Sequence, residues 1–485
     1  MRAPIDLEPL FPDRSSGEPL RGQLVRRFRN AIESGFFPAA SRLLPSRELA
    51  GRLGVSRNTL TAALDQLIAE GYLEARIGSG TFVTKTLHEA HARSVTTQRP
   101  LSQSPRKLAE VKTKLDEVGS SFGPLRVGAP DLSAFPIQVW RRIERESLAL
   151  VDAHFDYGES AGLLALREAI SRHVAQFRGV VADPQQIVVV EGAQGALHLA
   201  AFVLLGRGDR VAIEDPCYQL ARAVFTAHGC VLRGISVDDN GIRTDELPTG
   251  IALAYVTPTH QFPLGGSLPL ARRTQLLVWA RENGSYIVED DYDSEFDSHP
   301  LPALQSLDRD ERVIYIGTFS KTLAPGLRLG YVVAPPHLEE MFRFARELMS
   351  LGASTHLQAT LASFITRGHF SRHVRRMGKI YERRRRMLVS ELGKRLPPGC
   401  RIGPAQTGLH LTVNGPADFD DVRAANSMPD GHRVLPVSSL CVDRTDCRGL
   451  AMGFSAGSDD TIASAARSLA AAFHWDTQSP VSRNT

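Results

Sequence analysis

Apolar residues near the start of the chain have the spacing of three short helices. The first set recurs every four positions, which places it on one helix face, and consists of Leu20, Leu24, Phe28 and Ile32. A second helix is predicted from Ser46 to Leu53, where Gly54 turns the chain. Ser56 is placed to cap a third helix, whose inward positions are Leu60, Leu64, Leu67 and Ile68. Two short helices joined by a tight glycine turn predict a helix-turn-helix.

The third helix is followed by the pattern of a small β-hairpin. Two short segments, YLEAR and TFVTK, flank a glycine-rich turn at residues 77–80. The first turn of the third helix carries Arg57, Asn58 and Thr59. Arginine can bind guanine or phosphate, asparagine can bind adenine, and a helix N-terminus favours an anion. The pattern therefore indicates a recognition helix and a wing that contact double-stranded DNA.

Beyond residue 122 the hydrophobic pattern changes to short apolar runs that alternate with helical segments. The runs cover residues 187–192, 210–216, 251–258, 285–293 and 312–321. Fully apolar short strands between helices predict an α/β fold with a mostly parallel sheet that is covered on both faces. Functional groups are then expected at the carboxyl ends of the strands. The polar residues found there are Asp290, Tyr292, Ser320 and Lys321.

Composition and charge divide the chain into parts. Its 485 residues are too many for one core, and 42% hydrophobic with 23% charged residues indicate a folded protein. Residues 20–86 hold ten basic against five acidic residues, although the whole chain carries only +4, and a compact basic part fits nucleic acid. A polar Ser/Thr-rich stretch separates it from the rest. We therefore expect a DNA-binding domain at 18–86, a flexible linker at 87–121 and a large domain at 122–485.

The sequence also indicates where the protein acts. No apolar run approaches the roughly 20 residues that span a bilayer, and the N-terminus lacks the pattern of a secretory signal. We expect a cytoplasmic protein without a membrane segment. The five cysteines are scattered and have no C-x-x-C spacing, so neither a disulfide framework nor a metal site is predicted.

The strand ends suggest chemistry at an aldehyde. Lys321 lies at the end of an apolar strand, where a lysine is partly desolvated. Desolvation favours the neutral amine, which is the form that reacts with an aldehyde to give a Schiff base. Asp290 could keep a pyridinium nitrogen protonated, and Tyr292, on the same strand face, could hydrogen-bond a ring hydroxyl.

Other residues suit a phosphate and an aromatic ring. The turn Gly192-Ala193-Gln194 leads a strand into a helix, where backbone N–H groups favour an anion. Ser320 and Arg328 add a hydroxyl and a guanidinium, and Tyr218 could stack on the ring.

Two sets of motifs resemble known families. The run LPSRELAGRLGVSRNTLTAALDQLIAEGYLEARIGSGTFV resembles the winged helix-turn-helix of the GntR family. The segments VVVEGAQGALHLA, IEDPCY, VTPTHQFPLGG, VEDDYDSEF and GTFSKTLAPGLRLGY resemble the fold-type I pyridoxal phosphate (PLP) aminotransferases. Joined in one chain, the two parts resemble the MocR/GabR family of bacterial transcriptional regulators.

The resemblance implies functions for individual residues. The implied DNA-contacting positions are Arg47, Ser56, Arg57, Asn58, Thr59, Ser79 and Gly80. The implied cofactor-binding positions are Lys321 (as the PLP aldimine), Asp290, Tyr292, Tyr218, Thr318, Ser320, Arg328, Ala193, Gln194 and His260. The resemblance also implies a large fold-type I domain with a smaller C-terminal α+β part. It further implies a head-to-tail homodimer that binds operator DNA.

The chain departs from the aminotransferase pattern in two places. Transaminases usually carry Asn-Pro-x-Gly beside the cofactor oxygen, whereas this chain has Phe262-Pro263-Leu264-Gly265. The arginine that usually binds the substrate carboxylate is replaced before the pair Gly453-Phe454, and Arg444 or Arg448 could substitute for it. Both departures fit a site that holds PLP, and a small-molecule amine effector, without efficient transamination.

Three hypotheses follow. The first is a PLP-dependent transcriptional regulator that senses PLP, or its aldimine with an amino compound, and shifts DNA binding by linkage. The second is an active aminotransferase whose DNA-binding head regulates its own gene. The third is a large domain that has lost PLP and serves only for dimerisation. Sustained release of a keto product would distinguish the second from the first.

A basic stretch near residues 372–386, RHVRRMGKIYERRRR, has helical spacing. Two interpretations are open for its positive face. It could touch DNA between half-sites, or it could be a solvated or acid-paired helix surface.

Overall fold

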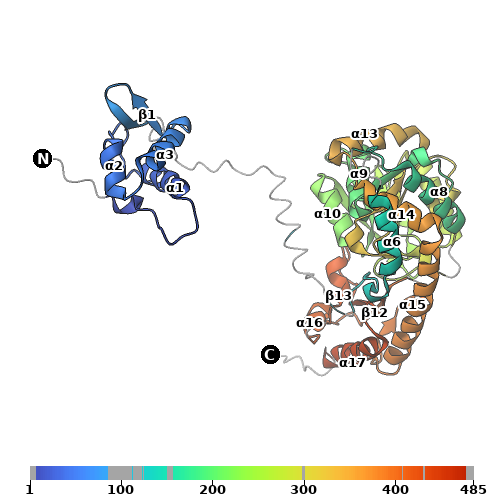
Figure 1. The fold of residues 1–485 in the computed structure, drawn as a ribbon. Coiled ribbons are helices and arrows are strands. Elements are labelled where there is room, and N and C mark those ends of the chain that lie inside the picture. The colour runs from blue at the N-terminus through green and yellow to red at the C-terminus, as the bar shows by residue number, and fades with distance from the viewer. Residues whose placement is uncertain are drawn as a thin grey trace. The chain divides into compact units, whose positions relative to one another are not determined.

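The computed structural model describes residues 7–85, 112, 123, 125–149, 157–297, 301–406, 408–429 and 432–476. The chain divides into two compact units, residues 1–100 and 101–485 (Figure 1). The expected linker at 87–121 lies outside the described residues, apart from 112. Over the described part of the chain, no helix is both long and apolar enough to cross a membrane.

The N-terminal unit is a winged helix-turn-helix, as predicted. Its elements are α1 (Leu20–Glu33), α2 (Ser46–Leu53), α3 (Arg57–Ala69), β1 (Leu73–Arg76) and β2 (Gly80–Val83), preceded by a short 3-10 helix (Glu8–Leu10). Gly54, in the left-handed region at φ 67°, ends α2. The backbone N–H of Thr59 donates to Ser56 Oγ at 3.0 Å, so Ser56 caps α3. Leu60, Phe28 and Leu67 are fully buried between the helices.

The larger unit is built on an eight-stranded sheet with the strand order β3-β10-β9-β8-β7-β4-β5-β6. Its strands are β3 (Ile187–Val190), β4 (Arg210–Asp215), β5 (Val231–Asp238), β6 (Gly241–Ile242), β7 (Leu253–Val256), β8 (Tyr286–Asp291), β9 (Val313–Thr318) and β10 (Gly330–Val333). The five central strands from β9 to β5 pair in parallel, whereas β10 and β6 pair antiparallel with their neighbours. The prediction of a mostly parallel sheet is confirmed.

Helices cover both faces of this sheet. They are α6 (Ile137–Leu148), α8 (Leu164–Arg178), α9 (Gly192–Leu204), α10 (Gln219–Ala227), α11 (Leu270–Asn283), α12 (Leu304–Leu307), α13 (Glu339–Ser350), α14 (Thr355–Thr366) and α15 (His369–Gly393). Val188 and Val190 of β3 pack against residues of α9 and α10, whereas Ile187 and Val189 pack with residues of α6, α8 and α14. Because successive side chains point to opposite faces, burial on both faces requires the continuous apolar runs seen in the sequence.

The C-terminal part forms a smaller α+β layer, as expected. Its antiparallel sheet has the order β11-β12-β14-β13. The elements are β11 (Arg401–Ile402), β12 (His410–Asn414), β13 (Leu435–Pro436), β14 (Gly449–Gly453), α16 (Asp421–Asn426) and α17 (Asp459–Asp476). Leu411 and Met452, directly opposite each other, share a core with Ile462 and Leu469 of α17.

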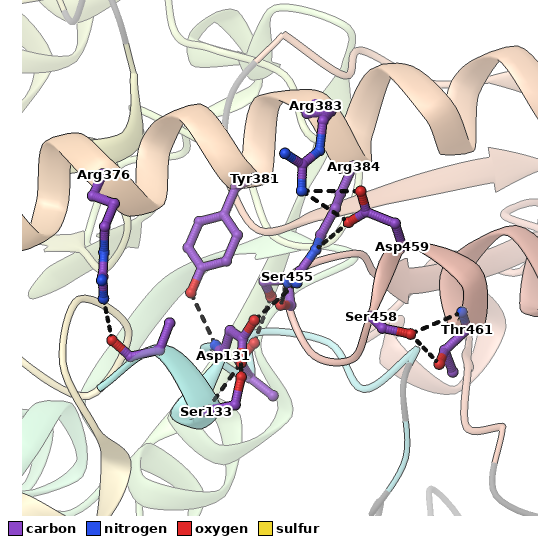
Figure 2. Close-up of polar contacts among 12 residues, drawn as sticks. Asp131, Ser133, Arg376, Tyr381, Arg383, Arg384, Ser455, Ser458, Asp459 and Thr461 are labelled. Atoms are coloured by element: carbon purple, nitrogen blue, oxygen red, sulfur yellow. Dashed lines mark hydrogen bonds and ion pairs between the residues drawn. The ribbon is translucent and has the colours of Figure 1, made fainter. Parts of the chain in front are cut away.

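Arginines of the basic stretch on α15 bond within the domain (Figure 2). Arg384 lies 2.9 Å from Asp131 and 3.2 Å from Asp459, and it is 6% exposed. Arg383 pairs with Asp459 at 2.9 Å, and Arg376 donates to the Ala134 carbonyl. These contacts join α15 to residues 131–134 and to the start of α17. They favour an acid-paired helix surface over a DNA-contacting one for these side chains.

Candidate functional site

A cavity of about 290 Å³ opens at the carboxyl ends of the parallel strands. Its wall brings together every predicted cofactor-binding residue except His260. These residues are Ala193, Gln194, Tyr218, Asp290, Tyr292, Thr318, Ser320, Lys321 and Arg328. Residues separated by more than a hundred positions in sequence thus share one wall because parallel strands end at the same sheet edge.

Asp290 lies near the end of β8 and presents an unsatisfied oxygen. The Tyr255 hydroxyl donates to Asp290 Oδ2 at 2.8 Å, whereas Oδ1 is buried and has no hydrogen-bond partner among the described residues. Burial raises the pKa of Asp290 to about 6, partly opposed by the Tyr255 hydrogen bond. The carboxyl is therefore ionised near neutral pH and has room for one further donor. A protonated ring nitrogen is a donor of this kind.

Lys321 follows β9 in the same wall. Burial lowers the pKa of its amine, and the negative charges of Asp293 and Asp290 partly oppose the shift. Gly128 approaches the amine closely: a Cβ on Gly128 would lie 2.9 Å from Lys321 Nζ, and its φ is +67°. The positive φ favours glycine at this position, and a larger residue would crowd the end of the lysine side chain.

One corner of the cavity suits an anion. Helix α9 begins at Gly192, whose φ is +73°, and a Cβ there would lie 3.4 Å from Arg328 Nη1. Arg328 also donates to the Glu191 carbonyl, which fixes its guanidinium beside the helix N-terminus. The hydroxyl-bearing residues Thr318 and Ser320 line the same cavity. Backbone N–H groups, a guanidinium and hydroxyls are the donors that suit an anionic group such as a phosphate.

Aromatic side chains form the remaining walls. Tyr218 contacts Phe262 edge to face with ring centroids 5.7 Å apart, and Gln194 Nε2 lies 3.5 Å from the Tyr218 hydroxyl. Burial raises the pKa of Tyr218 to about 12, so its phenol stays neutral. Phe262 stands where transaminases usually carry asparagine, and its ring offers no hydrogen bond to a cofactor oxygen.

The structure places His260 behind the cavity wall. Its Nδ1 lies 3.0 Å from Asp293 Oδ2, and the Tyr292 hydroxyl donates to the His260 carbonyl at 2.6 Å. His260 is 2% exposed and is not among the residues that line the cavity. Because the Tyr292 hydroxyl donates its proton to the His260 carbonyl, its oxygen can act only as a hydrogen-bond acceptor toward a ligand in the cavity.

Several cavity residues were not predicted from the sequence, among them the polar residues Arg126, Tyr255 and His410. His410 begins β12 of the smaller sheet, and neither ring nitrogen has a hydrogen-bond partner of ordinary geometry within the described residues. Burial, with the nearby His260 and Lys321, holds the pKa of His410 well below its usual range, so the ring is neutral. The available sequence signal was the alternation His410-Leu411-Thr412-Val413, which places two polar side chains on one strand face.

His260, Asp293 and His410 also form the cluster best suited to a metal ion. Their ligand atoms lie within 4.8 Å of one another. Asp293 Oδ2 already bonds with His260 and with the Leu409 N–H at 3.1 Å, and the two imidazole rings lie tilted at 35° to each other with centroids 4.3 Å apart. Hydrogen bonding and ring packing therefore account for this arrangement without an ion.

The predicted DNA-contacting residues lie on the surface of the N-terminal unit. Ser56, Arg57 and Asn58 are exposed at the start of α3, and Thr59 is half-buried. Arg47 on α2 and the turn residues Ser79 and Gly80 are exposed as well. Neither arginine forms an ion pair with another described residue. Their guanidinium groups are therefore available to phosphates and base edges.

Comparison with known proteins identifies both units. Residues 20–83 match the family of bacterial regulatory proteins named gntR, and residues 124–439 match aminotransferase class I and II. The chain is 34% identical over 476 residues to the probable rhizopine catabolism regulatory protein MocR of Rhizobium meliloti, covering 96% of each. It is 31% identical over 467 residues to the pyridoxine biosynthesis regulator PdxR of Corynebacterium glutamicum, covering 95% of this chain and 96% of PdxR.

Solved aminotransferase structures resemble the larger unit. Pyrococcus horikoshii kynurenine aminotransferase aligns with a TM-score of 0.70 at 25% identity, covering 81% of this chain and 100% of its own. The multiple substrate aminotransferase of Thermococcus profundus aligns with a TM-score of 0.70 at 27% identity, covering 81% and 99%. Aminotransferases of class I and II depend on PLP as a family, and GntR domains bind DNA. The chain therefore belongs to the MocR-type family of GntR transcriptional regulators, which join a winged helix-turn-helix to an aminotransferase-like domain.

Proposed function

We propose that this regulator binds PLP in the cavity and changes its DNA affinity when PLP, alone or with an amino compound, occupies it. The observation that carries the proposal is the meeting of Lys321 with the unpartnered Oδ1 of Asp290 in one cavity wall. When bound, PLP supplies an aldehyde that links covalently to amines. The Lys321 amine, whose pKa is lowered, suits the aldehyde of PLP, and the free carboxylate oxygen of Asp290 suits the ring nitrogen.

Each wall of the cavity has a proposed part in binding. Lys321 holds PLP covalently, and Asp290 accepts a hydrogen bond from the ring nitrogen. The corner formed by Arg328 and the start of α9 binds the phosphate, with Thr318 and Ser320 adding hydroxyls. Tyr218 covers the ring face, and Tyr292 offers an oxygen as acceptor.

The proposed effector is a small amine. Phe262 replaces a hydrogen-bonding asparagine, and β14 (Gly449–Gly453) contains no arginine to bind a carboxylate. Both features remove contacts that transaminases use, and they support effector sensing over efficient turnover. The names of the relatives refer to rhizopine catabolism and to pyridoxine biosynthesis. Because these are different processes, the names do not identify one amine as the effector.

The proposed output is binding to double-stranded operator DNA through α3, Arg47 and the wing, by a homodimer. The ligand would act by linkage, because it favours one arrangement of the protein and so shifts the population that binds DNA. A coupling free energy of about 1–3 kcal/mol would change operator affinity by roughly 5–150-fold.

Covalent attachment of PLP is the first prediction. Borohydride reduction of the PLP-loaded protein, followed by peptide mass spectrometry, should place the PLP adduct on Lys321, because its amine is the one that faces the cavity with a lowered pKa. Lys321→Ala should lose the adduct. A matched control is Lys379→Ala on α15, which should keep the adduct at Lys321. Adducts spread over surface lysines in the wild-type protein would contradict the proposed site.

The second prediction concerns pH. Asp290 has a pKa of about 6, so it is ionised above that pH and becomes neutral below it. Non-covalent PLP affinity, measured by calorimetry in Lys321→Ala, should therefore fall as pH decreases, by roughly fivefold between pH 6 and pH 5. The double variant Lys321→Ala/Asp290→Asn has a side chain of nearly the same shape at position 290, but this side chain cannot ionise. Its PLP affinity should therefore lack the part of the decrease that protonation of Asp290 causes. Equal pH dependence in both proteins would exclude Asp290 as the partner of the ring nitrogen.

The third prediction concerns DNA. Arg57→Ala should weaken binding to a duplex from upstream of the protein's own gene by about 1–3 kcal/mol, measured by fluorescence anisotropy at fixed salt. Arg26→Ala is the matched control, because it removes the same charge from α1, where Arg26 pairs with Glu18 at 2.7 Å. Its effect on affinity should be small. Equal losses in the two variants would mean that only net charge, and not the recognition helix, determines binding.

A further inference from the structure

The wall of the cavity includes a second arginine besides Arg328. Arg126 belongs to the segment that leads into Gly128, and it lines the cavity. Burial lowers the pKa of Lys321, and the positive charge of Arg126 adds to this shift, so the guanidinium lies close enough for the amine to sense it. Lys321 and Arg328 already have proposed parts in binding the aldehyde and the phosphate of PLP. Arg126 is therefore the cavity cation that remains for a further anionic group.

The end of β14 fixes the backbone that carries Arg126. The N–H of Gly453, the last residue of this strand, donates to the Leu125 carbonyl at 2.8 Å. A Cβ on Gly453 would clash with the Arg126 carbonyl, so glycine at this position permits the close approach of the two backbones. Arg126 thus enters the cavity beside the strand that itself contains no arginine.

A second polar side chain reaches the cavity from the same point of the smaller sheet. His410 of β12 is paired directly opposite Gly453, and it lines the cavity. Its ring is fully buried, and neither nitrogen has a hydrogen-bond partner of ordinary geometry among the described residues. A buried polar group without a partner is costly, and an oxygen of a ligand would satisfy its N–H. The sheet therefore brings two donors, a guanidinium and an imidazole, into the cavity from one place.

The two arginines that the sequence offered as substitutes lie elsewhere. Arg444 pairs with Asp446 at 2.8 Å and donates to the Val237 carbonyl at 3.1 Å. Arg448 donates to the carbonyl of its neighbour Cys447 at 3.0 Å. Neither arginine is among the residues that line the cavity. The guanidinium that can replace the missing one therefore comes from a segment far earlier in the chain.

We propose that Arg126, together with His410, binds a carboxylate of the effector, so that the effector is an amino acid and not a simple amine. This inference rests on the proposed function, because it concerns an effector that joins PLP in the same cavity. A guanidinium and a carboxylate form charge-assisted hydrogen bonds, which are strong where water is partly excluded. Arg126 is half-buried and meets this condition. Because it comes from a different segment than the arginine of transaminases, this contact agrees with sensing without efficient turnover.

Matched pairs of compounds test the proposal on the full-length protein loaded with PLP. The probes are straight-chain amino acids from glycine to 5-aminopentanoate, each beside the alkylamine in which a hydrogen replaces the carboxylate. Isothermal titration calorimetry should show that the wild-type protein binds at least one amino acid roughly tenfold or more tightly than its matched amine. In Arg126→Met this preference should disappear, because the two compounds then differ by a group that has lost its partner. The readout is the ratio of two affinities in one protein, so a general loss of structure does not imitate it.

Two further variants make the result specific. Arg448→Met, the matched control, removes the arginine directly before β14, which does not line the cavity, and it should keep the wild-type preference. Arg126→Lys keeps the positive charge and should keep part of the preference.

The possible failures are distinguishable. The proposal is overturned if the wild-type protein, loaded with PLP, prefers none of the amino acids to its matched amine, or if Arg126→Met keeps the preference. A wild-type protein that takes up no PLP would instead contradict the proposed function, and this inference with it.

Discussion

The cavity depends on the parallel pairing of the central strands. Because β4, β7, β8 and β9 run in one direction, the residues near or just after their carboxyl ends meet at one edge of the sheet. This geometry brings Tyr218, Asp290 and Lys321 into one wall. The strands themselves are buried on both faces and are therefore apolar, so polar chemistry is confined to their ends. Burial disfavours charge on both Asp290 and Lys321, which leaves each of them ready for a ligand that supplies a partner.

The parts that depend on local pattern could be predicted from the sequence. The capping Ser56, the turn at Gly54 and the wing are fixed by contacts between near neighbours, and the apolar strands follow from burial on both faces. The contribution of His410 could not be predicted. It reaches the cavity because the smaller sheet packs against the segment that follows β7. There the Thr412 hydroxyl of β12 donates to the Pro263 carbonyl at 2.6 Å. His260, which was also expected to bind the cofactor, does not line the cavity; its Nδ1 lies 3.0 Å from Asp293 Oδ2, a contact that its position in the sequence did not reveal.

Asp215 joins the C-terminal part of the chain to the cavity wall. It ends β4, its buried carboxylate accepts the backbone N–H groups of residues 442–444, and Tyr218 follows it by three positions. In a regulator, a ligand in the cavity acts through the free energy by which it favours one state of the protein over another.

The central claim is that the aminotransferase-like domain controls DNA binding through a ligand held at Lys321. A binding isotherm on the upstream duplex at fixed salt tests it most directly, with the protein as apo-protein, with PLP, and as Lys321→Ala with PLP. The account predicts that PLP shifts the affinity of the wild-type protein by roughly 5-fold or more, and that Lys321→Ala removes this shift. Equal affinities in all three samples would contradict the claim that PLP itself is the effector.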